Sequence, residues 1–266
     1  MTLRREVRSA LTFEVVDPTA FVLALAVAEG VPTTVETLRV ALDGAPVETR
    51  PLREAHGTRL ALFETGPGIL QVDYAATVIG RADPVPTSPL DPIVYLRPSR
   101  YVQSDTLTPF ARDTFPGVDG AALVRAVAEW VHTRLEYRPD ATSPIGGAAE
   151  TLDAGAGVCR DYAHLTAALL RALDVPARLV SVYAPQLVPM DLHAVVEAYI
   201  EGRWVVVDAT RLAPRRSMIR MATGRDATDT AFETNTLADV VLRAMSVDAR
   251  ADEEFVDDPD ELVELS

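Results

Sequence analysis

The sequence predicts an α+β protein, with an N-terminal antiparallel β-sandwich followed by a core in which a helix N-terminus packs on an antiparallel sheet. Short β-rich runs occupy roughly the first 80 residues, prolines then cluster, and beyond residue 120 helical periodicity gives way to strands. The length of 266 residues and the hydrophobic fraction of 48% fit two folded domains. We divide the chain into a sandwich domain with its connector (1–98), a core (99–248) and an acidic tail (249–266).

The β-rich runs near the N-terminus have the spacing of an antiparallel sandwich. Turn formers separate them, for example Asp17-Pro18, Asp43-Gly44 and Gly66-Pro67-Gly68. The runs predicted as strands are Leu11–Val16, Phe21–Val27, Thr34–Ala41, Arg59–Glu64 and Ile69–Ile79.

The connector is marked by prolines at 84, 86, 89, 92 and 98, which oppose both a helix and a central strand. In the core, apolar residues recur at helical spacing from Gly120 to Tyr137, and again from Cys159 to Leu173 after the flexible Gly155-Ala156-Gly157. Strand-like runs follow the second helix. The predicted strands are Arg178–Tyr183, His193–Ile200 and Trp204–Asp208.

The formal charge of −14 and the scatter of arginine along the chain argue against a nucleic-acid partner. Much of the acidic excess lies between Asp252 and Glu264, which we expect to be a frayed tail without a chemical role. The N-terminus lacks the apolar stretch of a secretion signal, and the run Phe21–Ala28 is too short to span a bilayer. We therefore expect a cytoplasmic protein without a membrane partner.

Cys159 is the single cysteine, so the sequence offers no pair for an internal disulfide. The sequence also lacks a His-x-x-x-His zinc pair, a calcium loop and a complete nucleotide-binding glycine loop. We therefore predict no metal and no organic cofactor, and Cys159 is left as a thiol whose purpose needs an explanation.

The predicted position of Cys159 at the start of a helix favours a reactive thiolate. Unpaired backbone N–H groups and the helix dipole stabilise negative charge at such a position. The alternative interpretation is structural, because a free cysteine often serves as a small buried hydrophobe.

A nucleophilic thiol needs a base, and the chain contains four histidines. His56 lies in the sandwich and His132 on the other helix, whereas His164 follows Cys159 by five residues, about 140° around the same helix. His193 opens a predicted strand, from which a side chain can face the helix start. We therefore select His193 as the base, although a single histidine is more often structural.

The predicted hairpin brings Asp208 next to His193. With Glu201-Gly202 as a two-residue turn, the numbers of opposed residues sum to 403, so Asp208 faces Val195. Because side chains alternate along a strand, His193 lies on the same face, and Asp208 becomes its diagonal neighbour. A three-residue loop would break this parity.

These positions suggest a division of roles. Cys159 would attack a carbonyl, His193 would accept the thiol proton and later protonate the leaving amine, and Asp208 would orient His193. The backbone N–H of Cys159 is a candidate donor to the oxyanion. Gln103 could supply a second donor, but we favour the alternative that it is an exposed polar loop residue.

Several motifs resemble the transglutaminase-like superfamily in order and spacing. The chain looks most like the bacterial cysteine-protease group with an N-terminal β domain. The resemblance implies a papain-like core whose catalytic triad is Cys159, His193 and Asp208. The motifs are Gly155–Leu165, Val175-Pro176-Ala177-Arg178, His193-Ala194, Trp204–Thr210, Pro98-Ser99-Arg100-Tyr101 with Ser104-Asp105, and Gly224-Arg225-Asp226-Ala227 with Ala231-Phe232.

Two departures from the family pattern lie near the predicted triad. Val195 stands where the family commonly has an aromatic residue, and Asp208-Ala209-Thr210 replaces the commoner Asp-Pro-Thr. Both leave the triad intact and affect the substrate cleft. Three further residues also look like family residues, and on physical grounds we interpret them as a network that supports the helix start: Arg160, Asp161 and His164.

The resemblance and the triad favour a cysteine-dependent hydrolase that cleaves an amide of a protein or peptide substrate through a thioester. The alternative is a protein-glutamine transglutaminase, which passes the acyl group to an amine when the cleft excludes water. A third hypothesis is a non-catalytic binding module, against which the presence of all three triad residue types argues. The substrate, the second oxyanion donor, the role of the β domain and the oligomeric state stay open at this point.

Overall fold

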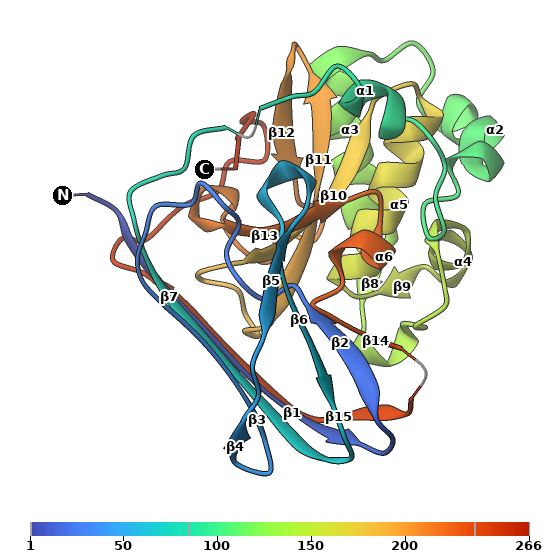
Figure 1. The fold of residues 1–266 in the computed structure, drawn as a ribbon. Helices are drawn as coiled ribbons and strands as arrows, with labels where there is room; N and C mark the ends of the chain where they lie inside the picture. The colour runs from blue at the N-terminus through green and yellow to red at the C-terminus, as the bar shows by residue number, and fades with distance from the viewer. Residues whose placement is uncertain (1, 85, 237, 266) are drawn as a thin grey trace.

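Alternation of inward and outward residues along β1 (Arg4–Val15) and β7 (Gly68–Ile79) builds the first sheet of a β-sandwich. The computed structural model, which describes residues 2–84, 86–236 and 238–265, pairs these two strands antiparallel along their length (Figure 1). Their inward residues, Val7, Leu11 and Val72 among them, lie in the sandwich core. The predicted N-terminal sandwich is therefore confirmed.

The sandwich consists of two antiparallel sheets. Its other strands are β2 (Thr19–Leu23), β3 (Thr33–Leu42), β4 (Ala45–Pro46), β5 (Arg50–Arg53), β6 (Arg59–Thr65), β14 (Glu233–Thr236) and β15 (Val240–Ala251). The five-stranded sheet has the order β15-β1-β7-β3-β4, and the four-stranded sheet has the order β14-β2-β6-β5.

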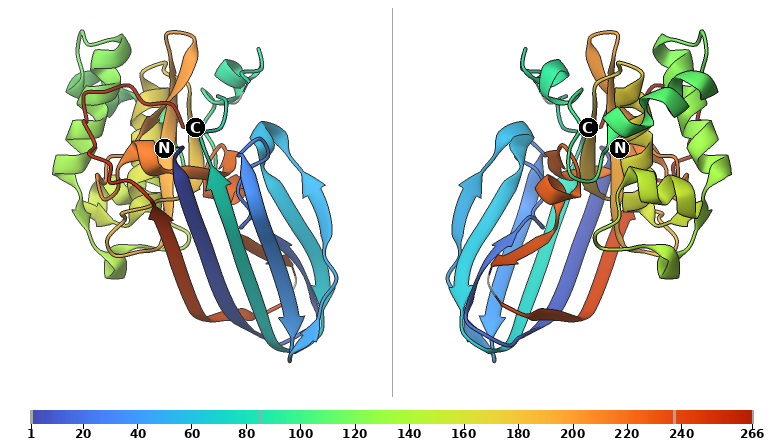
Figure 2. Two further views of the ribbon diagram at one scale, coloured as in Figure 1. Left: turned by 90° about the vertical axis from the view of Figure 1, so that its left-hand side faces the viewer. Right: turned by 90° about the vertical axis from the view of Figure 1, so that its right-hand side faces the viewer.

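The core contains a second antiparallel sheet, built from β10 (Ala177–Tyr183), β11 (Leu192–Ile200), β12 (Arg203–Val207) and β13 (Ile219–Gly224) in the order β12-β11-β10-β13. Apolar residues of α3 (Gly120–Arg134) and α5 (Cys159–Ala172) pack on one of its faces. Figure 2 shows these helices on the side of the core sheet that faces away from the sandwich. The remaining elements are α1 (Asp91–Val94), α2 (Ser104–Thr114), α4 (Ala148–Ala154), α6 (Ala227–Thr230), the parallel pair β8 (Glu136–Tyr137) and β9 (Ala156–Gly157), and 3-10 helices at Ala55–Gly57, Pro139–Ala141 and Arg215–Ser217.

The predicted core elements agree with the structure within three residues at each end. α2 was not predicted, because Pro109 lies inside it and proline normally opposes a helix interior. The four-residue helices α1 and α6 and the two-residue strands β8 and β9 are too short to give a periodic signal.

Buried contacts fix the sandwich against the core. Tyr183 and Met221 of the core sheet lie in the same apolar cluster as the sandwich strands. Arg5 of β1 is fully buried, and its guanidinium donates hydrogen bonds to the backbone carbonyls of Gly80 at 2.8 Å and Met218 at 3.0 Å. A buried guanidinium needs such acceptors, so these bonds hold the two parts in one relative position.

The C-terminal part of the chain differs from the expectation in two ways. β14 and β15 return to the sandwich and pair with β2 and β1, so the boundary predicted at 248 falls inside β15. The stretch expected to be a frayed tail is packed where it is described, because Val263 bridges to Val206 and Leu265 is buried. Apolar contacts and ion pairs with arginine hold this stretch in place. The acidic composition alone gave no indication of these contacts.

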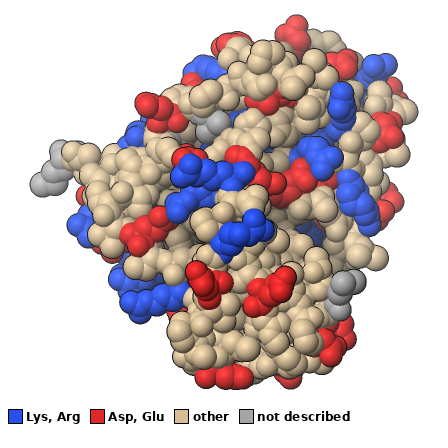
Figure 3. Space-filling model, viewed as in Figure 1, with Lys and Arg blue, Asp and Glu red and all other residues tan. Residues whose placement is uncertain are grey.

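Charged side chains of both signs are interspersed over the face seen in Figure 3, and no large patch of one sign stands out there. Within the described ranges, no helix is both long and apolar enough to cross a membrane.

Candidate active site

Cys159 is the first residue of α5, the buried helix behind the core sheet. The helix begins at this point because Val158 is extended and the Asp161 carboxylate accepts a hydrogen bond from the Val158 N–H at 2.9 Å. The thiol is partly exposed, unlike most of the helix behind it. Cys159 therefore combines access to solvent with the positive end of a helix dipole.

Gly157 allows the chain to approach this helix start closely. A Cβ atom at Gly157 would lie 2.6 Å from the Cβ of Asp161 and 2.7 Å from one of its carboxylate oxygens. Arg160 braces the same turn, since its guanidinium donates to Thr142 Oγ1 at 2.9 Å, to the Ser143 carbonyl at 2.6 Å and to Asp161 at 3.2 Å. The predicted support of the helix start by Arg160 and Asp161 is thus present.

The register of the β11–β12 hairpin places His193 and Asp208 together. Ile200 pairs with Arg203 across Glu201-Gly202, both of which have positive φ, as a two-residue type I′ turn requires. This is the predicted register, and the Nε2 atom of His193 lies 2.8 Å from an Asp208 carboxylate oxygen.

The second ring nitrogen of His193 is left for the thiol. Since Nε2 is engaged by Asp208, Nδ1 is the nitrogen available for the hydrogen bond between His193 and the Cys159 side chain. Burial works to lower the pKa of His193, but the Asp208 carboxylate and the Cys159 sulfur raise it to about 10. The site therefore favours a protonated His193 ring next to the Cys159 sulfur.

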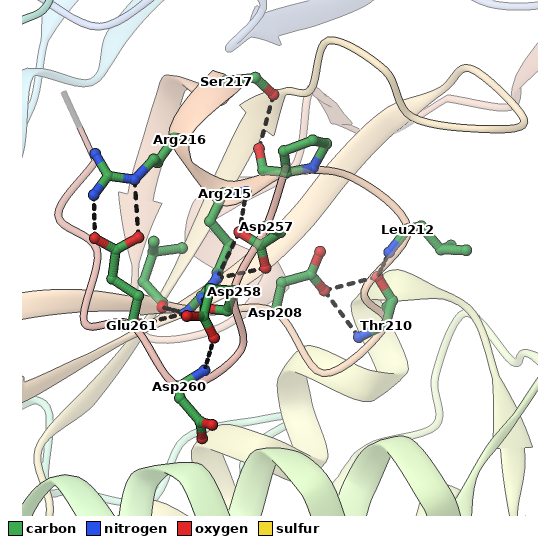
Figure 4. Close-up of polar contacts among 12 residues, drawn as sticks. Asp208, Thr210, Leu212, Arg215, Arg216, Ser217, Asp257, Asp258, Asp260 and Glu261 are labelled. Carbon is green, nitrogen blue, oxygen red and sulfur yellow. Dashed lines mark hydrogen bonds and ion pairs between the residues drawn. The ribbon is translucent and has the colours of Figure 1, made fainter. Parts of the chain in front are cut away.

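Asp208 is held ionised by partners for both of its oxygens. One oxygen faces His193, and the other accepts hydrogen bonds from the backbone N–H of Thr210 at 2.9 Å and its hydroxyl at 2.7 Å (Figure 4). Burial raises the pKa of Asp208, but His193 and Thr210 outweigh it and lower the pKa. The carbonyl of the intervening Ala209 is fixed by Nδ1 of His132 at 2.9 Å.

The other three histidines are engaged elsewhere. His132 supports the loop after Asp208, and His56 of the sandwich domain lies beside Arg178 and Asp91. His164 is fully buried, stacks on Tyr101 with ring centroids 5.2 Å apart and accepts a hydrogen bond from the Ala227 N–H at 3.2 Å. Burial lowers the pKa of His164 to about 3, so its ring is neutral.

Gln103 directly precedes α2, its side chain reaches the start of α4, and it does not line the cleft around Cys159. Its amide nitrogen donates to Glu150 at 3.1 Å, and its amide oxygen accepts from the Ala149 N–H at 3.3 Å. The side chain thus caps a helix, which agrees with the non-catalytic alternative.

A cleft of about 480 Å³ opens between the core and the sandwich and contains the thiol. Cys159, His193 and Ala194 line its core wall, and residues of β14 and β15 line the opposite wall. The return of the chain to the sandwich therefore completes the cleft, which the division into sequential domains did not predict.

Three polar residues near the thiol were missed by the sequence analysis. Tyr137 forms a hydrogen bond with the Cys159 backbone, and burial, together with Cys159 and Asp191, raises its pKa to about 12. Asp191 and Glu233 line the cleft. Pairing of Tyr137 with Gly157 in a two-residue parallel bridge gives no sequence signal, and neither do isolated acidic residues at the ends of strands.

Among the residues described, no three His, Cys, Asp or Glu side chains come close enough together to hold a metal ion. Cys159, His193 and Asp208 lie in a row, an order of side chains that suits nucleophilic catalysis by a thiol.

Comparisons with known proteins cover different shares of the chain. Residues 111–209 match the model of the transglutaminase-like superfamily. The crystal structure of a candidate cysteine protease from Cytophaga hutchinsonii is 33% identical, has a TM-score of 0.89, and is matched over 98% of this chain and 96% of that chain.

Two further matches are more limited. An uncharacterised protein of Mycobacterium leprae is 32% identical over 116 residues, which span 41% of this chain and less than half, 42%, of that relative. The periplasmic domain of TgpA from Pseudomonas aeruginosa is 19% identical over 80% of this chain and 90% of that chain, with a TM-score of 0.41.

Proposed function

Because this chain belongs to the transglutaminase-like superfamily, we propose that it is a cysteine-dependent amide hydrolase with the triad Cys159, His193 and Asp208. The observation that carries the proposal is the arrangement of the three side chains. His193 contacts Asp208 at 2.8 Å through one ring nitrogen, while its other nitrogen serves the thiol at the helix start. A partly exposed thiol beside a buried imidazole–carboxylate pair is the arrangement that nucleophilic catalysis requires.

In the proposed reaction, the Cys159 thiolate attacks the amide carbonyl carbon and forms a C–S bond. His193 gives its Nδ1 proton to the amide nitrogen, the C–N bond breaks, and the amine leaves. Water then attacks the thioester and gives a proton to His193, the C–S bond breaks, and a carboxylic acid is released. Asp208 holds the ring in place and stabilises its charged form throughout.

The oxyanion formed in each attack needs a hydrogen-bond donor near the thiol. We assign this role to the backbone N–H of Cys159 at the start of α5, which in the structure is hydrogen-bonded to Tyr137 and would exchange that partner for the oxyanion. Removing one such donor typically slows an acyl transfer by about 10²–10³-fold.

Transfer to an amine is the second candidate function, and one feature of the sequence favours it. All 25 basic residues are arginine, and the sequence contains no lysine. Guanidinium groups stay protonated and do not attack a thioester, whereas lysine side chains do so when deprotonated. A transglutaminase with this composition would therefore not acylate or cross-link itself through side-chain amines.

The test is to mix the protein with a pool of defined peptides, quench in acid and measure the intact mass. We expect a covalent adduct on Cys159 and shortened or deamidated peptides, with neither in Cys159→Ser. Adding 1,5-diaminopentane separates the two candidate functions, because a transferase would attach it to the peptide. A folded wild-type protein without any adduct or product would leave the binding module as the better account.

A further inference from the structure

The cleft beside Cys159 has an apolar interior. Leu192 and Met221 contribute from the core, whereas Phe232, just before β14, and Met245 of β15 contribute from the sandwich side. Such a lining suits an aliphatic stem of a substrate.

Glu233 contributes a carboxylate to the lining of this cleft. One of its oxygens is buried and forms no hydrogen bond within the described part of the chain. Burial raises the pKa of Glu233, which is the cost of holding a carboxylate where water is partly excluded. Unpaired carboxylates are rare in such positions unless they serve a ligand.

Asp191 supplies a second carboxylate from the core wall of the same cleft. Asp191 is exposed, and its carboxylate accepts a local hydrogen bond from the N–H of Leu192 at 2.7 Å but forms no ion pair among the residues that the structure describes. Burial raises the pKa of Asp191, and the nearby His193 only partly offsets this effect. The carboxylates of Glu233 and Asp191 therefore line the same cleft from opposite walls.

The cations that border the cleft are already engaged. Arg160 is hydrogen-bonded to Thr142, Ser143 and Asp161, and the charge of His193 is balanced by Asp208 and Cys159. Within the part of the chain that the structure describes, neither Asp191 nor Glu233 consequently forms an ion pair with an arginine of the cleft lining.

We infer that the substrate of this enzyme carries a cationic group on an apolar stem, which Glu233 and Asp191 bind beside Cys159. A lysine-like ammonium or an arginine-like guanidinium has this chemistry, since a cation donates charge-assisted hydrogen bonds to both carboxylates. The inference deepens the proposed function and rests on it for the reaction. The charge preference of the cleft can be measured without turnover.

The experiment uses Cys159, the single thiol, as its own probe. Three methanethiosulfonates are used, the cationic 2-aminoethyl, the anionic 2-sulfonatoethyl and the neutral methyl reagent. In each, the thiolate attacks the alkylthio sulfur, a mixed disulfide forms, the S–SO2 bond breaks and methanesulfinate leaves. Rates at Cys159 are followed by intact mass near pH 8 and divided by the rates for free N-acetylcysteine. This normalisation removes the intrinsic differences between the three reagents.

We expect the normalised cation-to-anion ratio to exceed unity by about tenfold, and to fall about threefold in Glu233→Gln and in Asp191→Asn. Glu48→Gln is the matched control, because Glu48 is exposed and does not line the cleft. A wild-type ratio near unity, or an equal fall in the control, would overturn the inference. The proposed function would survive that result if peptides still formed the Cys159 adduct.

A second measurement identifies where the cation resides. Peptide amides that contain lysine are compared with their norleucine counterparts, and 1,5-diaminopentane is compared with 1-aminopentane as an acceptor. A preference among the peptides that is lost in Glu233→Gln places the cation on the acyl donor. A preference among the amines that is lost in the same variant places it on the acceptor, and no preference in either series contradicts the inference.

Discussion

At the scale of single residues, the division of labour between the two nitrogens of His193 explains the site. Asp208 fixes Nε2, so Nδ1 is directed to the only thiol in the chain. Because Thr210 occupies the second oxygen of Asp208, the carboxylate cannot rotate away from the ring. In the proposed mechanism, the reactive state therefore depends on Asp208, an orienting group that does not itself react.

This division predicts unequal effects of two substitutions on peptide turnover. Cys159→Ala removes the nucleophile and should abolish adduct formation and turnover. Asp208→Ala leaves the thiol and the base in place, so we expect a loss of roughly 10²–10⁴-fold in kcat with measurable residual activity. Steady-state kinetics on both variants check this order. Equal losses in two folded variants would contradict the orienting role of Asp208.

The raised pKa of His193 also predicts how stability depends on pH. Because the folded protein binds this proton more tightly than the unfolded chain, the stabilisation is complete below about pH 6.5 and is lost as the pH rises through about 10. The difference in unfolding free energy between wild type and His193→Gln should therefore shrink by up to about 1.4 kcal/mol per pH unit in this window. Urea titrations at several pH values measure this difference in unfolding free energy. A difference that does not change with pH would contradict a protonated His193 in the folded protein.

The contact between His193 and Asp208 could be predicted at the residue scale, whereas Asp191 and Glu233 could not. The first follows from strand alternation and one turn, which are local in sequence. The two acidic residues line the same cleft although they are 42 residues apart in sequence (233 − 191 = 42), and no periodic pattern in the sequence brings them to one cleft.

At the scale of elements, the start of α5 decides where the thiol points. Asp161 caps the helix by accepting from Val158, and Gly157 leaves just enough room for that carboxylate. The glycine before the helix is therefore a steric requirement of the cap.

We expect Gly157→Ala to displace Asp161 and loosen the first turn of α5. The loss of a helix cap costs about 1 kcal/mol, and the added methyl group adds strain to that figure. Thermal unfolding and the rate of Cys159 alkylation should both report the change.

Gly66→Ala is the matched control, since a Cβ at Gly66 meets no atom within 4 Å. Its stability and alkylation rate should stay close to those of wild type. If Gly157→Ala behaves like this control, the helix start does not depend on the close approach.

The elements of the core were predictable where they are long and periodic, as in α3, α5 and the β11–β12 hairpin. The placement of β14 and β15 was not, because their pairing partners, β2 and β1, lie more than 200 residues earlier in the chain. Strand patterns show that a strand forms but do not identify the sheet that it joins.

At the scale of the whole molecule, a buried ionic cluster joins sandwich, connector and core. Glu197 receives hydrogen bonds from Arg178 at 2.7 Å and from Arg220 at 2.5 Å, and Arg178 lies over the Trp204 ring at 4.0 Å. Burial raises the pKa of Glu197, but the two arginines lower it to about 2, so the carboxylate stays charged. Arg178 also donates to His56 of the sandwich at 3.3 Å, which extends the cluster across the interface.

The C-terminal stretch is part of this assembly through Arg215. This nearly buried guanidinium binds Asp257 at 3.0 Å and donates to the carbonyls of Glu261 and Asp258, next to the loop that carries Asp208 (Figure 4). We expect Arg215→Met to destabilise the protein by roughly 3 kcal/mol, because it leaves a carboxylate and several carbonyls without their partner.

Arg216→Gln is the matched comparison. Arg216 also binds the stretch, through Glu261, but both side chains are exposed, so the loss should be small. Urea unfolding of the two variants distinguishes a packed C-terminal stretch from a frayed one. Similar small losses in both would favour the frayed tail that the acidic composition suggested.

The central claim is that Cys159 and His193 form an activated pair, and alkylation of the intact protein tests it most directly. Wild type and His193→Ala are exposed briefly to limiting iodoacetamide between about pH 5 and about pH 9, and the mass gain is measured. We expect wild type to react rapidly below pH 7 and His193→Ala to react only as the pH approaches that of an ordinary thiol. Equally slow reaction of both proteins, with the pH dependence of a free cysteine, would contradict the account.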